Sequence, residues 1–240
     1  MKRLALLSCT TSAVVALGIA ACGGDLTLPD ANAGVALRVV EGDGQQGTVG
    51  EALPSQVIVE LKTQAGAPLV GSQVAFLKAG TDPREEFDPD VVLTDAQGRA
   101  STRWVLGSVP GPYEAEARVV SEGDTTSTSV PLRADAIAGD PDSLRAASDT
   151  SRAGRRGQTF DEPLTVVVVD RFGNPVAGTD VEWKISGDGG SVSAEHTPTA
   201  ADGTASVMWT LGSHVGVQKV EAKVEKASGS PVTFASVVLF

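Results

Sequence analysis

An internal repeat constrains the fold of this chain more than any other feature of its sequence. Residues 103–111 read RWVLGSVPG, and residues 208–216 read MWTLGSHVG, 105 positions later. Residues 66–76 (GAPLVGSQVAF) and 173–183 (GNPVAGTDVEW) repeat with an offset of 107. A shared order at a nearly constant spacing indicates two copies of one structural unit of about 100 residues each, and a chain of 240 residues is long enough for both.

Within each copy, apolar residues recur at every second position. Apolar residues that alternate with charged or polar ones include Ala115, Ala117, Val119, Val220, Ala222 and Val224. A period of two predicts β-strands with one buried and one solvated face, and no part of the repeats has helical periodicity. Turns rich in Gly and Pro separate about seven short strands per copy. The chain is therefore predicted to be all-β, with two tandem immunoglobulin-like β-sandwiches.

The largest apolar side chains fall on the inward faces of the predicted strands. Trp104 and Trp209 occupy matching positions in the two copies, and Phe76 and Trp183 form a second matched pair. We expect all four in the hydrophobic cores, because each such ring buries about 150–250 Å². The alternative is a tryptophan that stacks against a ligand.

The first 22 residues have the order of a secretory signal, with basic Lys2 and Arg3 before a mostly apolar run. The run ends in Ile-Ala-Ala-Cys, which resembles the bacterial lipobox. That resemblance implies cleavage just before Cys22 and a diacylglycerol on its thiol; an ordinary signal with an incidental cysteine is the alternative. Cys9, the other cysteine, would leave with the signal, so no disulfide is expected.

These patterns give a plan of the chain, with a domain boundary where Gly139-Asp140-Pro141 breaks the strand pattern. The expected parts are a lipoprotein signal peptide (1–21), the lipidated Cys22 with a flexible tether (22–33), a first immunoglobulin-like domain (34–136) and a second one (137–240).

One stretch resembles a known family. Residues 170–178 read DRFGNPVAG and are followed by ADGTASV at 201–207. Between about residues 163 and 224 the chain resembles the bacterial immunoglobulin-like group-one domain of the invasin and intimin type. The first copy departs from the pattern, with QAGAP at 64–68 in place of the Asn-Pro turn and a longer acidic insert before Asp95. The resemblance implies extracytoplasmic β-sandwiches, often in tandem, that serve as stalks and adhesion modules; it does not transfer receptor binding.

The sequence holds few motifs for catalysis, and we expect no enzyme and no cofactor. Residues 42–47 (GDGQQG) fit G-x-G-x-x-G, but strand-like residues follow where a phosphate-binding loop needs a helix, so an inter-strand turn is favoured. His196 and His214 fall in predicted turns in different parts of the repeat, without the spacing of a zinc site. No G-x-S-x-G elbow is present.

Two charged clusters are candidate binding sites. The acidic stretch DPREEFDPD offers carboxylates, which calcium prefers, although a solvated loop is the alternative and no EF-hand spacing is present. The calcium candidates are Asp82, Glu85, Glu86, Asp88 and Asp90. Arg152, Arg155 and Arg156 form a basic patch between predicted strands, read as a solvated loop or as a weak contact for anionic glycan or lipid.

Charge and compartment together limit the partners. The formal net charge is −11, and removal of the signal leaves 17 basic against 30 acidic residues. This charge repels phosphate backbones, so nucleic acid is not an expected partner. Two functions stay open: a lipid-anchored, non-catalytic structural or adhesive module that binds protein or glycan, and a periplasmic accessory or ligand-binding subunit of an envelope assembly. Gly23 and Gly24 lack the early Asp that retains lipoproteins at the inner membrane in well-studied envelopes, so the outer membrane is expected by analogy.

Overall fold

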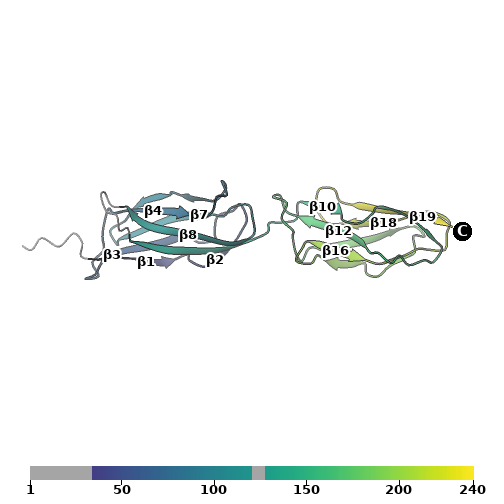
Figure 1. Ribbon diagram of the computed structural model, residues 1–240, viewed down its shortest axis with the longest axis horizontal. Coiled ribbons are helices and arrows are strands. Elements are labelled where there is room, and N and C mark those ends of the chain that lie inside the picture. The colour runs from purple at the N-terminus through teal and green to yellow at the C-terminus, as the bar shows by residue number, and fades with distance from the viewer. Residues whose placement is uncertain (1–33, 121–127) are drawn as a thin grey trace, which may run out of the picture. The chain divides into compact units, whose positions relative to one another are not determined.

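A computed structural model of the chain describes residues 34–120 and 128–240, and its regular elements there are all β-strands (Figure 1). The predicted all-β class is therefore confirmed. Across these two ranges, no helix has the length and apolar character needed to cross a membrane. The predicted signal peptide, Cys22 and the tether lie outside the described residues.

The first nine strands form two sheets around one hydrophobic core. One sheet has the order β1-β3-β7-β5, with bounds Val35–Glu41, Val57–Thr63, Arg99–Val105 and Glu86–Asp88. The other has the order β2-β9-β8-β4-β6, with bounds Gln45–Thr48, Ser129–Ile137, Gly111–Val120, Gln73–Lys78 and Val91–Leu93. Neighbouring strands are antiparallel except β2 and β9, which pair in parallel. We call this unit the first sandwich.

The remaining strands enclose a second core, and we call this unit the second sandwich. Its larger sheet has the order β11-β19-β18-β13-β15, with bounds Ser151–Arg155, Val232–Leu239, Gly216–Lys223, Asp180–Ser186 and His196–Pro198. The smaller sheets are β10-β12-β16 and β14-β17, with bounds Ser143–Ala146, Leu164–Val169, Thr204–Val207, Ser191–Val192 and Trp209–Thr210. Strands β11 and β19 pair in parallel.

Aromatic side chains anchor both cores. Trp104 and Trp209 are fully buried, and Phe76 and Trp183 are almost so. In the first sandwich Phe87 lies between Trp104 and Phe76, with ring centroids 5.1 and 5.7 Å away. Burying one large apolar side chain stabilises a fold by about 1.5–3 kcal/mol. Packing of this kind holds each sandwich together, because neither repeat contains a cysteine.

Three segments expected to be turns or loops are strands. His196 begins β15 and pairs with Glu182 in β13, so its assignment to a turn was wrong. Arg152 and Arg155 lie in β11 rather than in a loop. Part of the acidic stretch forms β5, where the buried Phe87 pairs with Trp104. These short strands contribute at most a few inward apolar residues, so they lack the repeated alternation that reveals longer strands.

The DRFGNP stretch forms a turn that a single buried carboxylate organises. Oδ1 of Asp170 accepts hydrogen bonds from the amides of Phe172 (2.8 Å) and Asn174 (2.9 Å). Oδ2 accepts from the Gly139 amide (2.9 Å) and from Nδ2 of Asn174 (3.0 Å). Burial acts to raise the pKa of Asp170, but these hydrogen bonds outweigh it and hold the pKa below its ordinary value. Gly173 has φ +87°, a conformation that glycine adopts without steric cost.

Candidate functional site

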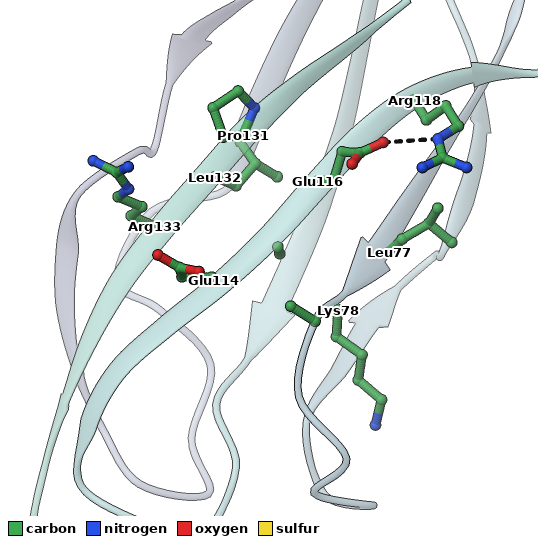
Figure 2. Close-up of a pocket in the computed structure, with 10 residues that line it drawn as sticks. Leu77, Lys78, Glu114, Glu116, Arg118, Pro131, Leu132 and Arg133 are labelled. Carbon is green, nitrogen blue, oxygen red and sulfur yellow. Dashed lines mark hydrogen bonds and ion pairs between the residues drawn. The ribbon is translucent and has the colours of Figure 1, made fainter. Parts of the chain in front are cut away.

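The outer face of the first sandwich carries a pocket of about 470 Å³ over β4, β8 and β9. We call it the sheet pocket; Figure 2 shows the side chains that line it, and β8 lies between the other two strands. Lys78, Glu114, Glu116, Arg118 and Arg133 contribute its charged groups. Alternation along β8 and β9 brings Glu114, Glu116, Arg118 and Arg133 onto one outward surface, whereas Lys78 ends β4 on the same side as the buried Phe76.

Opposite charges face one another across the sheet pocket. Glu114 is the register partner of Arg133 on the neighbouring strand. Glu116 accepts a 2.7 Å hydrogen bond from Nε of Arg118, shown dashed in Figure 2, and this bond holds the pKa of Glu116 below its ordinary value. Exposed ion pairs add little to stability, about 0–1 kcal/mol. Such groups are available to exchange partners when another charged surface docks.

A second pocket of about 460 Å³ adjoins the first, sharing Ala79 and Glu114 with it. We call it the Tyr113 pocket, after the only tyrosine in the chain. Its lining residues are Ala79, Gly80, Thr81, Asp82, Glu85, Val109, Pro112, Tyr113 and Glu114. The two pockets form one continuous candidate binding surface on the first sandwich.

Asp82 ties together two segments of the Tyr113 pocket. Its Oδ2 accepts hydrogen bonds from the amide (2.6 Å) and hydroxyl (2.7 Å) of Ser108, and its Oδ1 accepts from the Arg84 amide (2.9 Å). The bonds from Ser108 and then Arg84 lower the pKa of Asp82 to about 2. Asp82 therefore stays ionised at neutral pH and contributes a fixed negative charge.

Glu85, three residues later, has the opposite behaviour. The residue is 2% exposed, and its Oε1 accepts a 3.3 Å hydrogen bond from the indole nitrogen of Trp104. Burial raises the pKa of Glu85. The ammonium of Lys78 does not pair with this carboxylate but donates to the backbone carbonyls of Asp82 and Glu85, both at 2.6 Å.

The structure does not gather the calcium candidates into a metal site. Asp82 and Glu85 make the contacts just described, while Glu86, Asp88 and Asp90 are exposed along and beyond β5. Within residues 34–120 and 128–240, no group of three or more His, Cys, Asp or Glu side chains is placed to hold a metal ion. Cys22, the predicted lipidation site, lies outside these ranges.

The basic patch and the histidines serve local contacts in the second sandwich. Arg152 donates to the carbonyls of Glu162 (2.6 Å) and Pro163 (3.0 Å). Arg155 is exposed at the end of β11, and the guanidinium of Arg156 lies 5.5 Å from the ring centre of Phe240. The histidines pair separately with carboxylates, His196 with Asp180 at 2.8 Å and His214 with Asp188 at 3.2 Å.

Lys78 and Tyr113 are pocket residues that the sequence reasoning did not select. Comparison of the two copies could have revealed Tyr113, because the second copy has Gln218 at the matching position, 105 residues later. Gln218 is buried and bonds to the Gly212 amide and the His214 carbonyl, both at 2.8 Å. A structural glutamine in one copy and a pocket tyrosine in the other mark a place where the copies differ.

Comparisons with known proteins agree with this topology. Residues 160–237 match the model of the bacterial Ig-like domain (group 1). No curated protein sequence matches the chain. Among solved structures, FdeC, an Escherichia coli adhesin, is similar with 21% identity and a TM-score of 0.51 over 86% of this chain; the chain spans 64% of the length of that structure. Two further structures have lower TM-scores. The D00-D0 domain of intimin has 17% identity and a TM-score of 0.37, and the match covers 86% of this chain and 100% of that one. Invasin, a bacterial integrin-binding protein, has 24% identity and a TM-score of 0.36, and the match covers 85% of this chain and 39% of that one.

The family match and the strand order lead to one conclusion. The described part of the chain has an immunoglobulin-like β-sandwich fold, and residues 160–237 match the group-one bacterial Ig-like domain within it.

Proposed function

We propose that the chain is a lipid-anchored envelope protein whose immunoglobulin-like sandwiches act as a non-catalytic adhesive or protein-binding module. The observation that carries the proposal is the continuous surface of two pockets: charged side chains of both signs line the sheet pocket, and carboxylates line the adjoining Tyr113 pocket. Alternating charges of this kind suit recognition of another macromolecule, because they give specificity and speed encounter. The likeness in fold to an adhesin, FdeC, supports the same direction.

The anchor is proposed from the sequence alone. Cys22 follows Ile-Ala-Ala behind an apolar signal, and a diacylated cysteine would hold the chain at a membrane, since each buried methylene contributes about 0.8 kcal/mol. Growth with an alkyne-tagged fatty acid tests this in the native host. The wild type and Cys9→Ser should incorporate the tag, and Cys22→Ser should not. Tagging of Cys22→Ser would refute the anchor.

A second candidate function is that of a periplasmic accessory subunit, because the same charged surface suits a partner within the envelope. Protease treatment of intact cells, followed by blotting for the second sandwich, separates the two. Loss of the band, with a periplasmic marker left intact, places the sandwiches outside the cell and supports the adhesive module. Protection until the envelope is opened contradicts it and favours the accessory subunit.

A further inference from the structure

The carboxylate of Glu85 is only half satisfied inside the first sandwich. Its Oε1 accepts from Trp104, whereas its Oε2 is buried and has no hydrogen-bond partner among the residues that the structure describes. A Cβ added at Gly80 would lie 2.7 Å from Oε2, so this oxygen lies in space that any other residue at position 80 would fill. A buried oxygen without a donor costs about 1–3 kcal/mol, more for a charged group.

The second copy shows that the fold does not need this carboxylate. Trp209 matches Trp104 in the repeat, and its indole nitrogen donates to the backbone carbonyl of Gly189 at 2.8 Å. A neutral carbonyl thus satisfies the same indole in the second sandwich. In the first sandwich Glu85 accepts from this indole, although burial disfavours its ionised form. The carboxylate is therefore better explained by a role in binding than by a role in folding.

The surroundings of Glu85 indicate the charge of the ligand. Asp82 and Glu114 add two further carboxylates to the Tyr113 pocket, and the Asp82 charge is fixed. The ammonium of the nearby Lys78 donates to two backbone carbonyls, and its charge only partly offsets the rise that burial causes in the pKa of Glu85. Negative charge in a partly enclosed pocket attracts cations. A metal ion is disfavoured, because the described carboxylates do not come together as a ligand group.

We propose that the Tyr113 pocket binds the cationic side chain of a lysine or arginine presented by a partner protein. The ammonium or guanidinium would donate to the free oxygen of Glu85, and the Tyr113 ring offers a surface for cation–π attraction. Val109, 60% exposed, and Pro112 give the aliphatic stem an apolar wall. This inference rests on the proposed protein-binding function and names the chemistry that the pocket recognises.

Trp104 provides a direct reporter for the test. The chain has three tryptophans, so a ¹⁵N-labelled full-length chain in non-ionic detergent gives three indole signals, which single Trp→Phe variants assign. Nα-acetyl-lysine amide is titrated against its neutral analogue, Nα-acetyl-norleucine amide. We expect saturable movement of the Trp104 indole signal with the lysine probe only, while the Trp209 signal stays fixed as an internal control.

Two variants make the result decisive. Glu85→Gln keeps an acceptor for Trp104 but removes the charge, and it should weaken binding of the lysine probe by about tenfold or more. Glu221→Gln makes the same change in the second sandwich, at the position that matches Glu116 in the repeat and outside both pockets, and should leave binding within about twofold. Equal response to both probes, response to a neutral saccharide instead, no response, or unchanged binding by Glu85→Gln would each overturn the proposal. None of these outcomes bears on the protease and fatty-acid experiments, so the proposed function is judged separately.

Discussion

The amide of Gly139 donates a 2.9 Å hydrogen bond to Oδ2 of Asp170, 31 residues further along the chain. Gly139 lies between β9 and β10, and Asp170 begins the turn after β12. The carboxylate that shapes the DRFGNP turn therefore also fixes the segment that leads into the second sandwich. A motif residue recognised for its turn has a second structural role that its local sequence does not reveal.

Replacing Asp170 by Ala should destabilise the second sandwich by about 3 kcal/mol, because three amides and the Asn174 side chain lose a charged acceptor. Asp202→Ala is a matched control, since Asp202 is exposed and bonds only to Thr204 among the described residues. We expect that variant to lower the free energy of unfolding by about 1 kcal/mol. Urea denaturation followed by tryptophan fluorescence measures both. Similar losses for the two variants would contradict the proposed role of Asp170.

Two glycines with positive φ should respond differently to alanine. A Cβ at Gly190 (φ +88°) would lie 1.9 Å from the Thr210 carbonyl oxygen, whereas one at Gly187 (φ +63°) meets no atom within 4 Å. Gly187→Ala should lower the free energy of unfolding by about 1–2 kcal/mol, from backbone strain alone. Gly190→Ala should cost about 3–5 kcal/mol, because β14 and β17 must also separate. Thermal unfolding of both variants tests this difference, and a smaller loss for Gly190→Ala would contradict it.

Stability should depend on pH through Glu60, which contacts Lys62 (2.9 Å), Arg38 and Arg99 on the first sandwich. Hydrogen bonds from Lys62 and Arg38 lower its pKa from 4.5 to about 2. A lowered pKa stabilises the fold above pH 4.5, and that contribution disappears as the pH falls towards 2. Glu60→Gln should therefore lower Tm at pH 7, with the gap to wild type closing in acid. Glu225→Gln, an exposed control, should show no such convergence.

Glu85→Gln should change Tm at pH 7 in the opposite direction to Glu60→Gln. Burial raises the pKa of Glu85, so the folded state favours the neutral carboxyl and loses stability as the pH rises through that pKa. Glutamine keeps an acceptor for the Trp104 indole without the charge, so we expect a higher Tm at pH 7 and no difference well below pH 4.5. Calorimetry across this pH range measures the effect. A lower Tm at every pH would show that the carboxylate serves folding.

Reversing a charge in the sheet pocket should weaken attachment if the chain is an adhesin. Arg133 faces Glu114 across β9 and β8, so Arg133→Glu places two like charges opposite each other. We expect adhesion of a non-adherent strain that displays the chain to fall about fivefold, equivalent to about 1 kcal/mol. Lys219→Glu, in the second sandwich at the position that matches Glu114, is the control and should leave adhesion unchanged. Equal losses would contradict a role for the pocket.

The core strands were predictable because their signal is local. Val57, Val59 and Leu61 occupy every second position of β3, and all three are buried. The repeat strengthened the signal, since Leu164, Val166 and Val168 recur at the same spacing in the second copy and are buried in β12. Side-chain direction in a strand reverses at each residue, so sequence alone reveals which face turns inward.

The missed features depend on distant partners. Strand β5 has one inward residue, Phe87, and forms because Trp104 in β7 lies across from it. The contact between Glu85 and Trp104 likewise joins residues 19 positions apart, and no local pattern predicts it. The acidic stretch was recognised as a candidate for binding, but calcium was inferred from charge alone. The structure separates those carboxylates by burial and by strand pairing.

The parallel pairs β2–β9 and β11–β19 have a mechanical consequence. In each sandwich an early strand runs alongside the last one, from Gln45↔Ala134 to Thr48↔Ile137 and from Ser151↔Ala235 to Arg155↔Leu239. Tension that enters through the early strand and leaves through the last one slides the pair lengthwise. All of its hydrogen bonds then share the load and must break together, whereas an unzipping pair breaks them one at a time. A sandwich built in this way resists pulling through a high barrier to unfolding, which is the quantity that sets its lifetime under force.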